Sequence, residues 1–303
     1  MRQKTKTKSI EKHLSHWGIT FVLPSIVFFS LFNFYPILNA LYTSFFKKKV
    51  LSLAAPEFVG LKNYIYLLTS ANFWNSIRAT AVFTIGTFLP LLLASLIFAV
   101  FITSIKRGNK FYQMAFYSPA VLSSVVSAAI WLLIFDPRGL GNQWVNNLLG
   151  THGTDHNWLA DAMMVQLSTM IVYFWKYIGY FIIIFIAGLA SIPKSLYEAA
   201  RIDGTSGWQE FWRITLPLLK PTIVLVSIMS MLQCLKTFGI QYLFTQSGAP
   251  QDPINVITMN IYNTGIRDHR IGRASAMSII LFIIMLVFTW IQFKSSKSDE
   301  VEY

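Results

Sequence analysis

The sequence predicts an all-α protein that crosses a membrane six times. Of its 303 residues, 54% are hydrophobic and only 13% are charged, and the mean hydropathy is +0.51. Soluble domains rarely have this composition. The chain also contains six apolar runs, each long enough to supply the roughly 20 residues that a helix needs to cross a hydrocarbon layer. The six runs are Trp17–Phe45, Ala79–Ser104, Tyr112–Phe135, Met163–Leu189, Pro221–Thr245 and Ala274–Phe293.

The first run is unusual in its prolines and its length. It contains Pro24 and Pro36 and is longer than a straight span needs, so we expect it to kink or to extend along the interface. The basic segment 1–16 precedes it. We expect this segment not to act as a signal peptide, because the apolar run is too long and no small-residue cleavage site follows. Cys234 is the single cysteine, which excludes a disulfide framework.

The connection between the first two runs contains an amphipathic stretch, Asn63–Ile77. Its pattern fits a helix that lies at the outer membrane surface. A helical hairpin packed on the bundle would have the same pattern, and the sequence does not separate the two.

The distribution of Lys and Arg indicates the orientation. If the N-terminus is cytoplasmic, the inner segments carry fourteen of these residues and the outer segments nine. Cytoplasmic loops are expected to hold the excess. We therefore expect segment 1–16, the loop at about 191–220 and the tail 294–303 to be cytoplasmic, on either side of a transmembrane domain at 17–293. Anionic lipid accounts for the net charge of +12, and no basic helix interleaved with aromatic residues suggests nucleic acid.

The loop between the fourth and fifth runs has strong local signals for two short helices. Pro193 suits a first helical turn, and Gly204 can supply the left-handed residue that ends a helix after Ile202. Ser206 and Gln209 have capping-box spacing for a second helix over Gly207–Thr215, which we expect Pro217 to stop. An interfacial loop of this kind needs no partner to be stable.

Polar residues at helical spacing mark a candidate transport path. In the fifth run they are Ser227, Ser230, Cys234, Thr237 and Gln241, with Gln233 and Lys236 beside them. In the fourth run they are Gln166, Thr169, Tyr173, Lys176, Tyr177 and Tyr180. Serine and threonine also join packed helices, so helix packing remains an alternative for these residues. A lysine within a span is costly unless it faces water or a partner, so the lysines favour a wet interior.

Aromatic residues near these stripes favour a sugar as the solute, because the apolar face of a pyranose stacks on an aromatic ring while amides bind its hydroxyl groups. The candidates are Trp175, Tyr177, Tyr180, Phe238 and Tyr242.

The motif EAARIDG at Glu198–Gly204, followed by Phe211 and by ITLP at 214–217, resembles the EAA loop of permease subunits of binding-protein-dependent ABC importers. The resemblance extends over most of the chain, through FVGLKNY at 58–64, SPAV at 118–121 and GRASAMS at 272–278. Within this family the chain is similar to the carbohydrate branch, the maltose and glycerol-phosphate permease group. Of the two permease subunits in that branch, it is similar to the one whose first span holds two prolines. The chain departs from the family pattern at two places. SGAP at 247–250 stands where the family usually has a double glycine before proline, and Arg273 replaces a common aromatic residue. These departures leave the identity of the substrate open.

The resemblance implies a type I importer permease fold with a coupling helix that docks in a cleft of a cytoplasmic ATPase. The residues carried over to that role are Glu198, Ala199, Ala200, Arg201, Asp203 and Gly204. ATP and magnesium would be bound by the partner ATPase and no cofactor by this chain. The sequence contains no G-x-x-x-x-G-K-[ST] loop, so the chain is expected to be a transport subunit and not an enzyme.

The resemblance also implies the partners: a second, homologous permease subunit in a heterodimer, an ATPase dimer, an extracellular solute-binding protein and a carbohydrate, in a bacterial cytoplasmic membrane. The alternative is a secondary transporter or channel that works alone. All thirteen Asp and Glu residues lie outside the six runs, which argues against proton coupling.

Overall fold

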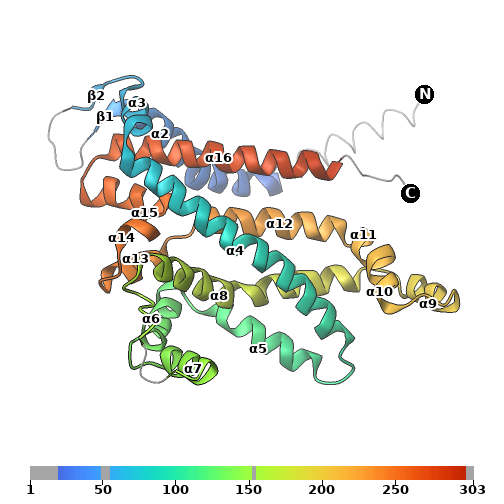
Figure 1. The fold of residues 1–303 in the computed structure, drawn as a ribbon. Coiled ribbons are helices and arrows are strands. Elements are labelled where there is room, and N and C mark those ends of the chain that lie inside the picture. Colours follow the sequence, from blue (N-terminus) through green and yellow to red (C-terminus); the bar gives the residue numbers. More distant parts are fainter. Residues whose placement is uncertain (1–19, 49–54, 152–154, 298–303) are drawn as a thin grey trace, which may run out of the picture. The chain divides into compact units, whose positions relative to one another are not determined.

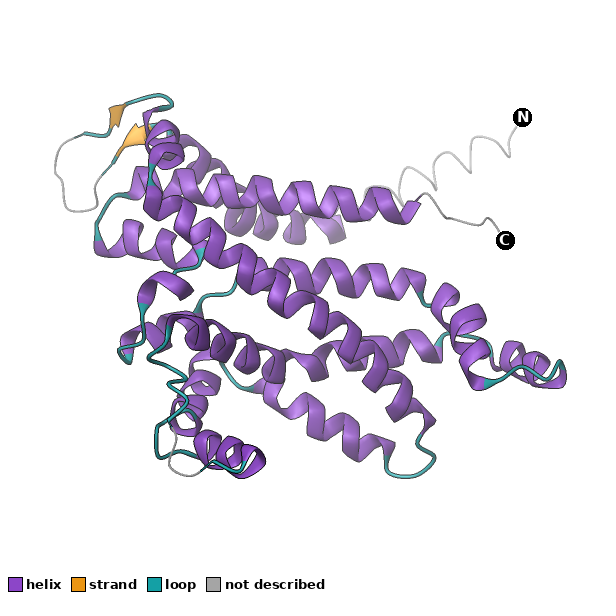
Figure 2. Cartoon of the chain, in the orientation of Figure 1, coloured by secondary structure: helices purple, strands orange, loops and turns teal. Residues whose placement is uncertain are grey.

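The computed structural model describes residues 20–48, 55–151 and 155–297. The described chain is helical apart from short loops and one pair of two-residue strands, β1 (Phe46–Lys47) and β2 (Glu57–Phe58) (Figure 2). The segment 1–16, the start of the first apolar run and the last six residues of the tail lie outside the described residues. The chain forms two compact units, a smaller one of residues up to 67 with 264–280, and a larger one of 68–263 with the residues after 280.

The first span in the smaller unit is a helix over Thr20–Ser44. It widens into a π-helical turn, η1 (Ser30–Phe34), before it continues as α2 (Tyr35–Ser44). The N–H of Tyr35 donates to the carbonyl of Ser30. A wider turn makes room for the ring of Pro36, which has no N–H to donate. The helix therefore accommodates this proline without ending.

A β-hairpin and a short helix follow the first span. β1 and β2 pair antiparallel, with Phe46 opposite Phe58. The helix α3 (Lys62–Thr69) begins four residues later, and Asn63 near its start donates hydrogen bonds to the carbonyls of Ser44 (2.8 Å) and Phe46 (3.1 Å). The predicted amphipathic stretch 63–77 is thus divided at Ser70, and its second half belongs to the next long helix. It is neither one surface helix nor a hairpin.

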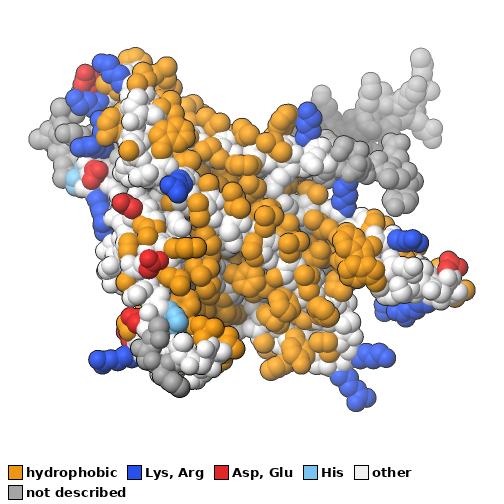
Figure 3. Space-filling model, viewed as in Figure 1, with side chains coloured by type: hydrophobic (Ala, Val, Ile, Leu, Met, Phe, Trp, Pro, Cys, Tyr) orange, Lys and Arg blue, Asp and Glu red, His pale blue; other side chains and the backbone are white. Residues whose placement is uncertain are grey.

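The core of the larger unit is built on α8 (Ala162–Ala190). The helices α4 (Ala71–Ser104), α5 (Asn109–Val121) and α12 (Lys220–Leu235) pack along it, and α12 also packs on α4 (Figure 1). Large side chains of α8 such as Phe181 are fully buried in this core. Figure 3 shows hydrophobic side chains over the face formed by α4 and α5, which matches a surface that meets lipid.

The close packing of α5 on α8 depends on Gly179. A Cβ at this position would lie 1.9 Å from the carbonyl oxygen of Phe116 and 2.7 Å from the amide nitrogen of Tyr117. Both atoms belong to the backbone of α5, so no side-chain rotation could relieve the contact. Small residues serve in this way where membrane helices approach closely.

The third span is broken, where the sequence predicted one helix over 112–135. The axes of α5 and α6 (Ser124–Ile134) meet at 101°. Ser123 caps α6 by accepting the N–H of Val126 (3.1 Å). The carbonyls freed at the end of α5 accept from a residue far along the chain, because the ammonium of Lys176 donates to Ala120 (3.3 Å) and Leu122. A side chain of α8, Lys176, therefore stabilises the bend.

The remaining elements complete the two units. They are α7 (Leu140–Leu149), α9 (Lys194–Ile202), α10 (Gly207–Glu210), the π turn η2 (Phe211–Thr215), α11 (Leu216–Leu218), α13 (Gly239–Gln246), α14 (Gln251–Ile254), α15 (Ile257–Tyr262), the π turn η3 (Asn263–Arg267) and α16 (Ile271–Lys297). Among the described residues, five helices are long and apolar enough to cross a membrane, or six when the bent pair α5–α6 counts as one span. The predicted six spans agree with the second count.

Candidate functional site

The first candidate site is the turn between α9 and α10, at the end of the larger unit where α8 and α12 connect (Figure 1). Pro193 is the N-cap of α9, one residue before the first turn in which the sequence placed it, and Gly204 follows the helix with a φ of +75°. The N–H of Thr205 donates to the carbonyl of Ala200 (3.1 Å), which closes the end of the helix. Glycine is favoured at Gly204 because a left-handed backbone strains any residue with a Cβ.

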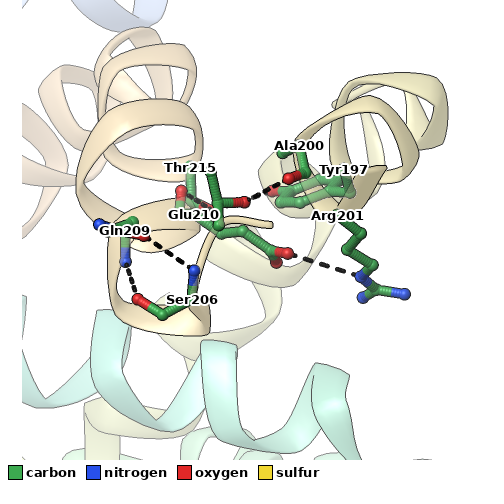
Figure 4. Close-up of polar contacts among 8 residues, drawn as sticks. Tyr197, Ala200, Arg201, Ser206, Gln209, Glu210 and Thr215 are labelled. Atoms are coloured by element: carbon green, nitrogen blue, oxygen red, sulfur yellow. Dashed lines mark hydrogen bonds and ion pairs between the residues drawn. The ribbon is translucent and has the colours of Figure 1, made fainter. Parts of the chain in front are cut away.

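The predicted capping box at the start of α10 is confirmed. The amide of Ser206 donates to Oε1 of Gln209 (2.9 Å), and the amide of Gln209 donates back to Oγ of Ser206 (3.3 Å) (Figure 4). The prediction that Pro217 ends this helix is wrong. Helical structure continues through η2 and α11 toward α12. The π turn just before Pro217 provides the wider geometry that its ring needs, as η1 does before Pro36.

Side-chain contacts hold α9 against the following helix. The guanidinium Nε of Arg201 lies 3.5 Å from Oε1 of Glu210, and the hydroxyl groups of Tyr197 and Thr215 lie 3.0 Å apart (Figure 4). The hydroxyl of Thr205 also donates to the carbonyl of Ala200 (2.7 Å). The two helices are therefore tied together at both the turn and the base, which favours movement as one piece.

The residues of the EAARIDG motif face two directions. Ala200 is buried within the chain, whereas Glu198, Ala199, Arg201, Asp203 and Gly204 are exposed. Ile202 stands among them with 87% of its surface exposed. Single exposed apolar side chains are common on protein surfaces, so Ile202 alone does not identify an interface. Of the two alanines, only Ala199 is accessible from outside the chain.

The second candidate site is a cavity of about 400 Å³ in the larger unit, where the fifth span is interrupted. Lys236, Thr237 and Phe238 lie between α12 and α13, outside regular helix. Small-molecule sites commonly have volumes of about 300 to 1,000 Å³. The lining residues are Ser124, Tyr173, Tyr177, Gln233, Lys236, Thr237, Phe238, Gly239 and Ile240.

The cavity combines polar groups with aromatic walls. Oε1 of Gln233 is buried without a hydrogen-bond partner among the described residues, and Lys236 is exposed. The ring centroids of the lining residues Tyr173 and Tyr177 lie 4.5 Å apart, and the lining residue Phe238 stacks on Tyr242 with centroids 5.2 Å apart. Such a lining can bind an uncharged polyhydroxyl solute by hydrogen bonds and stacking.

Comparison with known proteins shows the family to which the chain belongs. Residues 95–297 match the model of the binding-protein-dependent transport system inner membrane component. The chain belongs to this family. The candidate coupling turn, residues 193–217, and the cavity both lie within the matched residues.

Two relatives of this inner-membrane transport component and one solved structure are informative. A sn-glycerol-3-phosphate transport system permease protein, UgpA, from Agrobacterium fabrum is 32% identical over 90% of this chain and 92% of its own. A multiple sugar-binding transport system permease protein, MsmF, from Streptococcus mutans is 30% identical over 94% and 97%. A bacterial alginate ABC transporter, solved in complex with an alginate pentasaccharide-bound periplasmic protein, has the same fold with a TM-score of 0.80 at 23% identity, over 94% of each chain.

The structure of this transport component brings together half of the residues predicted for the path. Tyr173, Tyr177, Gln233, Lys236 and Thr237 line the cavity, and Tyr242 lies one ring behind it, against Phe238. The predicted stripe of the fifth span is not continuous, because the interruption at Lys236 separates its two halves. Thr237 and Gln241 are nevertheless linked, since the threonine hydroxyl donates to the amide oxygen (2.9 Å).

The other predicted path residues lie elsewhere. Lys176 is buried against the bend of the third span, Trp175 packs on Trp131 with ring centroids 5.7 Å apart, and Tyr180 lies in a separate groove with Tyr117. Gln241 is fully buried behind the cavity. At these positions the four side chains fit a role in helix packing better than contact with a solute.

The packing alternative also accounts for the serines of the fifth span. The hydroxyl of Ser227 accepts from the amide of Gln292 in α16 (2.9 Å), and that of Ser230 donates to the carbonyl of Val226 (2.7 Å). Sequence reasoning missed Ser124 and Tyr262. Ser124 lines the cavity because the third span bends, and Tyr262 lies 5.3 Å from the ring of Phe238. Helical spacing alone indicated neither position.

Proposed function

We propose that the chain is the permease subunit of an ATP-driven ABC importer that passes a sugar or oligosaccharide, delivered by an extracellular binding protein, across a bacterial cytoplasmic membrane. The observation that carries this proposal is the aromatic and amide-lined cavity at the interruption of the fifth span, in a chain of this family. Relatives named for sugars and for glycerol phosphate support the solute class.

The coupling turn supplies the proposed link to ATP. The exposed face of α9 would dock in a cleft of a cytoplasmic ATPase dimer, which would bind ATP and magnesium. The ties from Arg201 to Glu210 and from Tyr197 to Thr215 support this role, because they would pass a push on α9 to the spans on either side. A second, homologous permease subunit would complete the path in a heterodimer.

Copurification tests the proposal. A tagged chain expressed with its native partners should bring down a homologous membrane subunit and an ATPase whose hydrolysis rises with the loaded binding protein. A chain that transports as a single component, with no ATPase bound, would contradict the proposal and support a secondary transporter or channel.

We expect the path to depend on Gln233 and Lys236. Replacing both with Leu should lower uptake about tenfold or more, because each loses a hydrogen bond to the solute in a partly buried site. Uptake of labelled substrate into proteoliposomes measures this. Gln292→Leu is the matched control, an amide removed from a membrane helix where it bonds Ser227 instead of facing the cavity. Equal uptake by the cavity variant and the parent would assign these side chains to packing.

We expect both termini to be cytoplasmic, because the inner segments carry the excess of Lys and Arg. A reporter that is active only outside the cytoplasm should be silent when fused after Tyr303 and active when inserted in the loop between α6 and α7. The reverse pattern would show an inverted chain, and activity at both sites would show a miscounted span.

A further inference from the structure

The smaller unit contains a pocket that neither the transport path nor the coupling turn uses. It has a volume of about 410 Å³. Three chain segments form it: the end of β1, the stretch from β2 into α3, and the start of α16. The lining residues are Lys47, Lys48, Glu57, Val59, Lys62, Asn63, Arg270, Gly272 and Arg273.

The pocket carries a large excess of positive charge. Five of its nine lining residues are Lys or Arg, and Glu57 is the only acidic one. This carboxylate already lies near an ammonium, with Oε2 3.7 Å from Nζ of Lys47. Lys48, Lys62 and Arg270 remain exposed around the pocket. Converging cations of this kind attract an anion with several oxygens, since each can donate a charge-assisted hydrogen bond.

The floor of the pocket is held in place by hydrogen bonds. The buried amide of Asn63 donates to the carbonyls of Ser44 and Phe46, and the N–H of Val59 donates to the carbonyl of Phe45 (2.9 Å). The guanidinium of Arg273 lies over the ring of Tyr66, 3.5 Å from its centroid, which orients this cation. The charges are therefore presented by an ordered frame and not by a loose loop.

The position of the pocket along the chain matches the headgroup level of a membrane. Lys47 follows the first span by three residues, and Arg273 lies in the first turn of α16. Next to the cations, the side chains of Phe58, Leu61 and Ile65 are each about two thirds exposed. Cations beside exposed apolar side chains, at the end of spans, are typical of a protein surface that meets lipid phosphates above and acyl chains below.

We propose that this pocket binds the phosphate group of an anionic phospholipid in the leaflet that borders it. The five cations would surround the phosphate oxygens, while Phe58 and Leu61 would contact the glycerol and acyl chains. A free phosphate ion has the same headgroup chemistry but would leave the apolar side chains uncovered. The lipid source is therefore the one that the whole surface fits.

Native mass spectrometry of the full transporter complex, released from nonionic detergent, tests the proposal. The parent should retain phosphatidylglycerol at collision energies that remove phosphatidylcholine. Lys48→Gln with Arg270→Gln should weaken this retention about 30-fold, because each cation near an anionic lipid contributes a factor of about five. Both side chains are exposed, so the variant should fold. Arg78→Gln with Arg138→Gln is the matched control, which removes two exposed cations on the same predicted side of the membrane that do not line the pocket.

Each other outcome overturns the lipid assignment. Equal retention by the pocket variant and the parent would show that the cations do not hold the lipid. Binding of inorganic phosphate that the pocket variant loses, without selective retention of phosphatidylglycerol, would assign the pocket to a free anion. A pocket variant with unchanged lipid retention that needs more binding protein for half-maximal import would assign it to an acidic protein surface.

Discussion

Gly204→Val should remove most of the ATP hydrolysis that the loaded binding protein stimulates, and with it import, while the chain remains in the membrane. The φ of +75° at Gly204 is costly for a β-branched residue, by roughly 1 to 2 kcal/mol. Valine would change the angle at which the chain leaves α9 and would move the contact between Arg201 and Glu210. We expect hydrolysis stimulated by the loaded binding protein to fall about tenfold in the reconstituted complex.

A matched control separates the backbone effect from added bulk. Gly207→Val places the same side chain three residues later, in the first turn of α10, where a Cβ would meet nothing within 4 Å. This variant should keep most of the stimulated hydrolysis. If both valine variants lose it equally, bulk near the ATPase and not the conformation of Gly204 is the cause.

Glu198→Lys tests the same surface through charge. Glu198 is exposed on α9, so its reversal should leave the fold intact and weaken the contact with a partner. Copurification of the ATPase measures the loss, and Lys194→Ala at the start of the same helix should matter less. An ATPase that binds the Glu198→Lys variant and responds to it as to the parent would leave the turn as a capped interfacial loop.

Gly179→Ala should destabilise the larger unit by about 3 kcal/mol or more, at the upper end of overpacking effects. The new methyl carbon would lie 1.9 Å from the carbonyl oxygen of Phe116, so α5 and α8 would have to separate along their contact. The melting temperature of the detergent-solubilised complex measures the loss, together with the amount of chain recovered from membranes.

Gly86→Ala is the control for this prediction. Its Cβ would also be crowded, at 2.8 Å from the sulfur of Met170, but that atom belongs to a flexible side chain that can rotate away. We expect a clearly smaller loss of stability. Equal melting temperatures for the two variants would mean that the backbone contact at Gly179 is not required.

Local signals in the sequence predicted most of the local structure of residues 193–217. Helix caps depend only on residues a few positions apart. The spacing of Pro193, Gly204, Ser206 and Gln209 was therefore enough to place a helix end and a capping box. Pro217 was misread because a single proline does not reveal the π turn that precedes it. The spans were also predictable, since hydrophobic length is a property of one segment.

The cavity was only partly predictable because it depends on breaks in two helices. Gln233 and Thr237, which were chosen from helical spacing, both line the cavity, but that spacing assumed a helix that stops before Lys236. The serine at position 123 is an N-cap within an apolar run and could have indicated the bend of the third span. The partners of Lys176 could not be inferred, because they lie 54 and 56 residues earlier in the chain.

That separation has a consequence for biogenesis. During synthesis the N-terminal part of a chain becomes available first, so the bent third span can reach the bilayer before α8 leaves the ribosome. An ammonium entering hydrocarbon alone would be strongly disfavoured. Here the carbonyls of Ala120 and Leu122 would already be in the membrane, unpaired, when Lys176 arrives. The bent third span would therefore supply the hydrogen-bond acceptors that Lys176 needs. The charge that would hinder insertion of α8 would instead pair α8 with the third span.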